Sequence, residues 1–263
     1  MQNRDLLNIL LILALVVMSV SLADSILPQV RTQYEMLTLG LFPSAERAYS
    51  YGERHFSSPD RNSYDLDHAE YFFRKARHLD PQHPLVNHEI ARIYFLRGSL
   101  ETALDFINSQ IRYNGDVLHS FYVRGLILGY MGRYSEAARD YERYLVSDPT
   151  NWAAVNDYAW VLLKAGRPRE AAVASASALL DFPDNPWLLN THAIALYELG
   201  EFRLAREKAD AALLAVRYLS EEDWLRAYPG NDPKTADEGI QALRDAITGN
   251  VHTILVALGE EAV

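Results

Sequence analysis

Four glycines in this chain lie 34 residues apart, and an alanine follows each of them five residues later. A fixed period of this length is typical of chains built from stacked helical hairpins, because one short unit buries its apolar face only against its neighbours. The period therefore predicts an all-α chain that works by holding a partner. The glycines are Gly98, Gly132, Gly166 and Gly200, and the alanines are Ala103, Ala137, Ala171 and Ala205.

Each 34-residue unit reads as two helices with its glycine between them. Apolar residues recur three and four apart on both sides of the glycine, which is the spacing of amphipathic helices. Glycine suits the turn, because it adopts positive φ without a Cβ clash. A second in-phase series on the first helices (Ala91, Gly125, Ala159 and Ala193) predicts a small-on-small contact in each hairpin. The expected helix pairs are 85–97 with 100–113, 121–131 with 135–146, 153–165 with 168–180, and 187–199 with 202–216.

The pattern resembles the tetratricopeptide repeat family, which places alanine, an aromatic residue, alanine and proline on the second helix. The unit that begins at position 118 carries this pattern most fully, with Gly125, Gly132, Ala137, Tyr141 and Pro149. The resemblance implies an α-solenoid, a right-handed superhelix of antiparallel helix pairs. It covers residues 64–217: half of a degenerate repeat, then four repeats that begin at positions 84, 118, 152 and 186.

Some positions depart from the family pattern. The aromatic residue is replaced by Ser175 in the third unit and by Ala209 in the fourth. In the degenerate repeat, the second helix is expected at 66–79, where Phe73 occupies the aromatic position of the repeat. The first helix is expected at 44–56, with an enlarged loop after it.

Both ends of the solenoid are expected to be covered, because a terminal repeat exposes an apolar face. Residues 26–63 are interpreted as a linker with N-terminal capping helices, and residues 218–263 as a C-terminal helical cap. Within the C-terminal cap, Thr235 and Glu238 predict a capping box that starts a helix. Gly249 and Asn250 predict a break before a last helix at 251–258.

The first 25 residues have a different character. Residues 6–23 are apolar and carry no charge, and they are long enough to cross a hydrocarbon core of about 30 Å. We expect a signal anchor that leaves the solenoid on the non-cytoplasmic side, in the periplasm or on the extracytoplasmic face of a bacterium. Ser21-Leu22-Ala23 is similar to a cleavage site, so the alternative is a secreted chain cut before Asp24.

Composition narrows the function classes. The formal charge of −10 disfavours a nucleic-acid-binding surface, which needs a basic footprint. The chain has no cysteine, and motifs for a nucleophile elbow, a zinc protease or a phosphate-binding glycine loop do not occur. We therefore expect no enzyme activity, no catalytic residue, no metal and no cofactor; the oligomeric state is left open.

The resemblance also implies where a partner would bind, because first helices line the concave side of such solenoids. The free positions there are rich in aromatic residues and amides, which suit a protein or peptide segment. Packing in the core is the alternative for Trp160, Trp187 and Tyr197. The groove is expected to be lined by His88, Arg92, Phe95, His119, Tyr122, Leu126, Tyr130, Asn156, Trp160, Leu163, Trp187, Asn190, Ile194 and Tyr197.

Three functions fit these features. The leading hypothesis is a membrane-tethered or exported scaffold that binds a protein segment, in envelope assembly, secretion or maturation of exported proteins. The second is a constitutive structural subunit of a larger membrane complex. The third is a carbohydrate or small-ligand binder that uses Trp160 and Trp187 as stacking platforms, which a closed pocket would favour.

Overall fold

A computed structural model of the chain describes residues 28–57 and 63–260, and the regular structure in these ranges is helical. The chain divides into two compact units, Met1–Val86 and Asn87–Val263. The expected membrane segment at 6–23 and the cleavage site before Asp24 lie outside the described residues. Among the helices of the described ranges, none has both the length and the apolar character needed to span a bilayer.

The first unit contains α2 (Pro28–Leu41), α3 (Ala45–Phe56) and α4 (Leu66–Leu79). Helices α3 and α4 pack against each other as a hairpin, as the degenerate repeat predicted. Ser44 caps α3 by accepting the Arg47 N–H, and Asp65 caps α4 by accepting two backbone N–H groups. A Cβ on Gly52 would lie 2.6 Å from the ring of Phe73, so this glycine lets the aromatic side chain of α4 lie against the backbone of α3.

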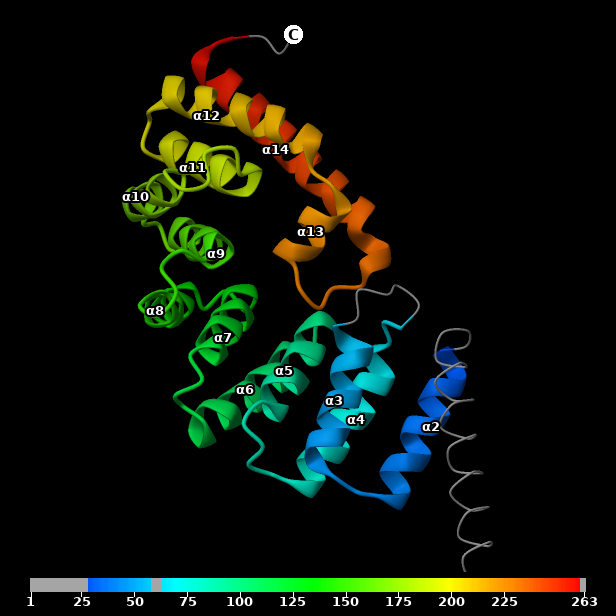
Figure 1. Cartoon of the computed structure of the whole chain (residues 1–263). Coiled ribbons are helices and arrows are strands. Elements are labelled where there is room, and N and C mark those ends of the chain that lie inside the picture. The colour runs from blue at the N-terminus through cyan, green and yellow to red at the C-terminus, as the bar shows by residue number, and fades with distance from the viewer. Residues whose placement is uncertain (1–27, 58–62, 261–263) are drawn as a thin grey trace, which may run out of the picture. The chain divides into compact units, whose positions relative to one another are not determined.

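The second unit contains four helix pairs, of which the first begins at the boundary between the units (Figure 1). The pairs confirm the expected hairpins, with ends within three residues of the expected ones. They are α5 (Val86–Leu96) with α6 (Leu100–Tyr113), α7 (His119–Tyr130) with α8 (Tyr134–Leu145), α9 (Trp152–Lys164) with α10 (Pro168–Ala178), and α11 (Pro186–Glu198) with α12 (Phe202–Ala215).

The four periodic glycines end the first helices in the conformation that the sequence predicted. Their φ angles are 71°, 75°, 72° and 80°. In each turn the glycine N–H and the next N–H bond back to the last turn of the helix, as Gly98 does to Phe95 and Ser99 to Tyr94. This pair of backbone hydrogen bonds is a Schellman motif, which satisfies carbonyls that the helix end leaves unpaired.

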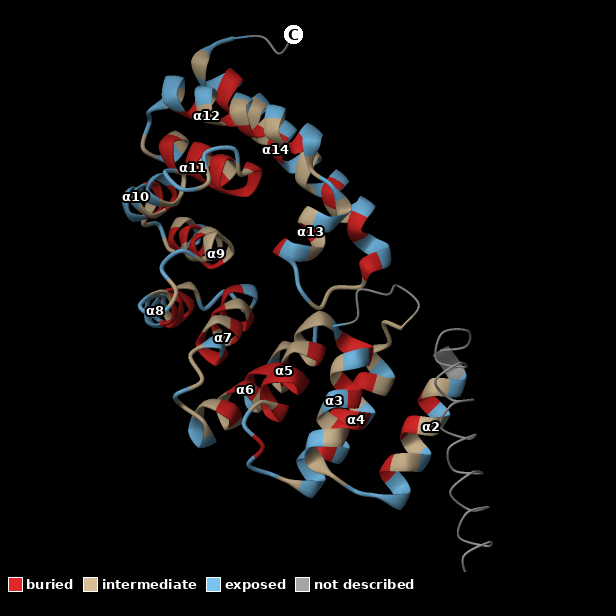
Figure 2. Ribbon diagram, viewed as in Figure 1, coloured by how far each residue is buried: buried red, intermediate tan, exposed pale blue. Residues whose placement is uncertain are grey.

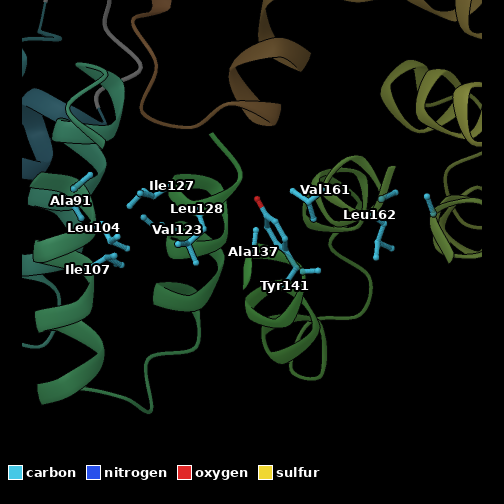
Figure 3. Close-up of a cluster of buried hydrophobic side chains, with 14 of the residues drawn as sticks. Ala91, Leu104, Ile107, Val123, Ile127, Leu128, Ala137, Tyr141, Val161 and Leu162 are labelled. Carbon is cyan, nitrogen blue, oxygen red and sulfur yellow. The ribbon is translucent and has the colours of Figure 1, made fainter. Parts of the chain in front are cut away.

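The core runs along the inside of the hairpins, where the periodic alanines are fully buried (Figure 2). The second hairpin differs from the small-on-small expectation. There the ring of the buried Tyr141 lies against Gly125, at a distance of 3.0 Å from where a Cβ would be. Tyr141 joins Ile107, Val123 and Val161 in one apolar cluster that crosses neighbouring hairpins (Figure 3).

The C-terminal part contains a 3₁₀ turn η1 (Val216–Tyr218), α13 (Glu221–Ala227), a second 3₁₀ turn η2 (Pro233–Thr235) and α14 (Ala236–Leu258). The expected break at Gly249 and Asn250 is wrong, because α14 is continuous and packs Ile247 and Ile254 against α11 and α12. A single glycine inside a helix costs only about 1 kcal/mol, which this packing offsets.

The capping box predicted at Thr235 is also wrong. The Thr235 hydroxyl donates to the carbonyl of Asp232 and does not cap α14. A capping box does form at α13, between Ser220 and Asp223.

Candidate binding surface

Helices α5, α7, α9 and α11 share one surface of the second unit, which faces α13 (Figure 1) and which we call the inner face. Toward the C-terminal ends of these helices, aromatic rings follow one another across three hairpins. The ring centroids of Phe95 and Tyr130 are 5.1 Å apart, those of Tyr130 and Trp160 are 6.3 Å apart, and those of Trp160 and Tyr134 are 6.0 Å apart. We call these four residues the aromatic strip.

Two of the four residues of the aromatic strip are exposed, and Phe95 and Tyr134 are half-buried. Tyr130 is 67% exposed and Trp160 is 36% exposed. Beside the strip, Gly129 lets α9 pack closely on α7, because a Cβ there would meet Val161 at 3.2 Å. The ammonium group of Lys164 lies over the Trp160 ring, 5.8 Å from its centroid, in a cation–π contact. Such exposed rings on a rigid backbone offer a large apolar contact area at a small entropic cost.

The other end of the inner face is covered by the chain itself. Residues 219–235, which we call the linker segment, join η1 to α14 and include α13. Trp187 is only 6% exposed, because Trp224 and Ala227 of the linker segment pack on it. Arg92 on α5 donates a hydrogen bond of 2.8 Å to the carbonyl of Pro229, and Asn190 on α11 accepts one of 2.9 Å from Asn250 of α14.

Several other residues expected in the groove are used in packing. Asn156 accepts a hydrogen bond of 2.8 Å from Thr191 on the next first helix, and Tyr197 packs with Phe202 and α14. His119 is exposed, with its ring edge-on to Tyr144. The three aliphatic members of the predicted groove are half-buried; they are Leu126, Leu163 and Ile194.

His88 is buried beside Ser120, with 3.3 Å between Nδ1 and Oγ. Burial, helped by the nearby charge of Arg92, lowers the pKa of His88 to about 3, so the ring is neutral at pH 7. Its 3.8 Å approach to Glu89 is therefore not an ion pair. The Glu89 carboxylate pairs instead with Arg92 at 2.7 Å, although burial raises its pKa.

Comparison with known proteins identifies the repeat. Residues 122–186 match the family model of the tetratricopeptide repeat (TPR). Residues 122–186 therefore carry this repeat. This agrees with the helix pairs, the positive-φ glycines and the buried alanines, which continue the same geometry on both sides of the matched residues.

Solved structures share the TPR fold with this chain. YrrB, a TPR protein with an unusual peptide-binding site, is 16% identical, with a TM-score of 0.58 over 69% of this chain and 91% of YrrB. MamA is 15% identical, with a TM-score of 0.56 over 70% of this chain and 94% of MamA. A MamA double mutant from RS-1 is 12% identical, with a TM-score of 0.59 over 66% of this chain and 94% of that protein. No curated protein matches the sequence significantly.

The inner face of the TPRs also holds a carboxyl group that the sequence analysis did not select. Asp157 on α9 accepts a hydrogen bond of 3.0 Å from the hydroxyl of Tyr122 on α7. Burial raises the pKa of Asp157 to about 7, and the hydrogen bond from Tyr122 opposes this shift only in part. The charge of Asp157 in turn adds to the burial that raises the pKa of Tyr122 and of Tyr228. The sequence gives no signal for this cluster, because Asp157 lies 35 residues after Tyr122 and 71 residues before Tyr228.

Replacing Asp157 with asparagine is expected to stabilise the protein at neutral and alkaline pH. The pKa of Asp157 lies above its usual value of 3.8, so the folded state holds the proton more tightly than the unfolded state. Folding stability from this group is therefore present at low pH and is lost as the pH rises toward about 7. Asparagine keeps an oxygen that accepts from Tyr122 and has no charge to bury.

Thermal unfolding followed by circular dichroism checks this expectation. The melting temperature of Asp157→Asn should exceed that of the wild type at about pH 8, and the difference should shrink toward about pH 4. A difference that is equal at both pH values would show that burial does not perturb Asp157.

An open cavity of about 820 Å³ lies near the N-terminal end of α11. Its wall includes Trp152, Phe182, Trp187 and Tyr218, with Asp184 and Arg226 among the polar residues. Trp160 does not line this cavity, so the cavity does not bring together the two tryptophans expected to stack a small ligand. Within the described residues, no group of three histidines or carboxylates could hold a metal ion.

Proposed function

We propose that the chain is a non-catalytic TPR scaffold that binds a protein or peptide segment along the aromatic strip. The observation that carries this proposal is the exposure of Tyr130 and Trp160, whose rings continue one another across neighbouring hairpins. Soluble domains seldom leave such rings uncovered in a row unless a partner covers them. Tryptophan and tyrosine are also enriched among the few residues that dominate the binding energy of protein interfaces. The peptide-binding site of YrrB, which has the same fold, supports this proposal.

We further propose that residues 6–23 tether the scaffold to a membrane, with the TPRs on the non-cytoplasmic side, or direct its export. The support is the uncharged apolar sequence of this segment. A tether raises the local concentration of the scaffold near membrane partners, so modest affinity suffices. Such a position suits envelope assembly, secretion or the maturation of exported proteins.

A structural role in a larger complex is the second candidate. Leu37, Leu41 and Phe42, at the end of α2 in the first unit, are all more than half exposed. A constitutive subunit would bury such residues in a large, dry interface. This role and segment binding by the aromatic strip involve different units, so the experiment on the strip separates them.

Replacing Tyr130 and Trp160 together with alanine is expected to reduce partner capture at least about tenfold, since each buried aromatic anchor contributes about 1–2 kcal/mol or more. Tagged full-length chain is purified from detergent-solubilised membranes, and co-purified proteins are quantified by mass spectrometry. The melting temperature of this variant is measured beside capture, because Trp160 also contacts Tyr130 and Tyr134 on neighbouring helices.

The matched control replaces two exposed apolar residues that lie outside the strip, Tyr113 and Leu180, with alanine. The control should capture the same partners as the wild type. Equal capture by the strip variant and the control would overturn the proposal.

A further inference from the structure

The linker segment lies on the inner face in the way that a bound peptide would. The ring of Tyr228 packs on Trp187 at 6.1 Å and on Trp224 at 5.1 Å. The Pro229 carbonyl accepts the hydrogen bond from Arg92, a residue 137 positions earlier in the chain. Aromatic anchors in an apolar pocket, with a hydrogen bond from a side chain to the peptide backbone, are the usual elements of peptide recognition.

The contacts at Tyr228 and Pro229 differ from those that hold the rest of the C-terminal part. Helix α14 packs along α12 through its own apolar residues, Ile247 and Ile254 among them. Trp224 lies against Gly239 of α14, where a Cβ would overlap the indole ring. Tyr228, by contrast, is 38% exposed, and the seven residues of α13 lie between two 3₁₀ turns. The end of the linker segment can therefore leave the inner face while α14 stays on α12.

We propose that the covered end of the inner face, formed by Arg92 and Trp187, is a second peptide-binding surface that the linker segment occupies in cis. The partner is a protein segment with the same chemistry: a tyrosine followed by proline, which places a ring on Trp187 and a backbone carbonyl at Arg92. This partner replaces Tyr228 and Pro229 on the inner face. The observation is separate from the exposed aromatic strip, so this proposal does not depend on the one for the strip.

The linker segment sets a threshold for the partner. A segment held in cis competes at an effective concentration in the millimolar range. A partner therefore binds only if its own affinity overcomes that competition, and any change that weakens the cis contact raises the apparent affinity for the partner.

The probe is a fluorescein-labelled peptide with the sequence of residues 219–232, LSEEDWLRAYPGND. Its binding to the purified full-length chain is measured by fluorescence anisotropy. Tyr228→Ala weakens the cis contact without touching the inner face, so it is expected to bind the peptide at least tenfold more tightly than the wild type. Tyr113→Ala, a substitution of the same kind at an exposed tyrosine on α6, should bind it as the wild type does.

A further substitution tests whether the peptide uses the proposed surface. Arg92→Lys keeps a positive charge beside Glu89 and lacks the planar group that donates to Pro229. The double variant Tyr228→Ala with Arg92→Lys should bind the peptide at least threefold more weakly than Tyr228→Ala alone. Equal peptide affinity of the wild type and Tyr228→Ala, including no binding by either, would overturn the proposal, as would a gain that Arg92→Lys leaves intact.

Hydrogen exchange of the wild type tests the proposal without any substitution, so its result does not depend on whether a variant folds. With the peptide in large excess, amides of residues 228–232 should exchange faster, while those of α14 keep their protection. Unchanged exchange at residues 228–232, under conditions where anisotropy shows bound peptide, would also overturn the proposal. Loss of capture by the strip variant has no bearing on these readouts, so the two proposals fail independently.

Discussion

Replacing Tyr141 with alanine is expected to lower the free energy of unfolding by about 3–5 kcal/mol, the usual cost of removing a buried aromatic side chain. Tyr141 is buried in the cluster that joins neighbouring hairpins, and its ring lies directly on the backbone of Gly125. Gly125 has no side chain that could fill the space, so the cavity would stay open between α7 and α8.

A second substitution in the same hairpin should recover part of this loss. The fourth hairpin holds Ala193 and Ala209 at the equivalent positions, and both are fully buried. Gly125→Ala combined with Tyr141→Ala reproduces that pair in the second hairpin. It also gains about 1 kcal/mol of helix propensity.

Chemical denaturation of these two variants measures the effect, with the exposed Tyr113→Ala as the control. The double variant should be more stable than Tyr141→Ala alone. A double variant that is less stable than Tyr141→Ala would show that the hairpins do not have interchangeable packing.

Replacing Arg124 with methionine is expected to cost about 2–3 kcal/mol, a little below the range for a fully buried ion pair. The guanidinium of Arg124 on α7 donates two hydrogen bonds of 2.7 Å to Asp140 on α8 and one of 3.1 Å to Asn108 on α6. Asp140 is buried, so losing Arg124 leaves a carboxylate without its cation and without water. One side chain therefore connects two hairpins.

Removing both charges should reverse most of the loss. In the variant Arg124→Met with Asp140→Leu, no charge is left buried, and apolar side chains fill the site. Arg133 makes an equally short double hydrogen bond to Glu136 on the protein surface, and Arg133→Met is the matched control. If Arg124→Met changed the denaturation midpoint no more than Arg133→Met does, the buried pair would not be holding the hairpins together.

The sequence predicts the repeat well, because the features that define it are local. A glycine that ends a helix and an alanine at a close helix contact act within a few residues, so a simple period reveals Gly98 and Ala103 and their equivalents. Gly52 was missed, although it lies under Phe73 as Gly125 lies under Tyr141. The enlarged loop between α3 and α4 shifts it out of the 34-residue phase.

The surface was harder to predict, because it depends on contacts between distant residues. Burial of Trp187 follows from Trp224, which is 37 residues away, and the hydrogen bond of Arg92 reaches Pro229. Neither contact can be predicted from the 34-residue repeat. Gly249 was misleading for a related reason, since local preference favours a break and the tertiary packing of α14 overrides it.

The most direct test of the central claim is photo-cross-linking from single positions of the full-length chain in the cells that produce it. A photoreactive phenylalanine derivative replaces Trp160 on the aromatic strip or, as the control, the exposed Val173 on α10. We expect position 160 to yield a discrete cross-linked protein partner that the control position does not yield. The same partner captured with equal yield from both positions, or from position 173 alone, would contradict the claim that this TPR chain binds its partner through the strip.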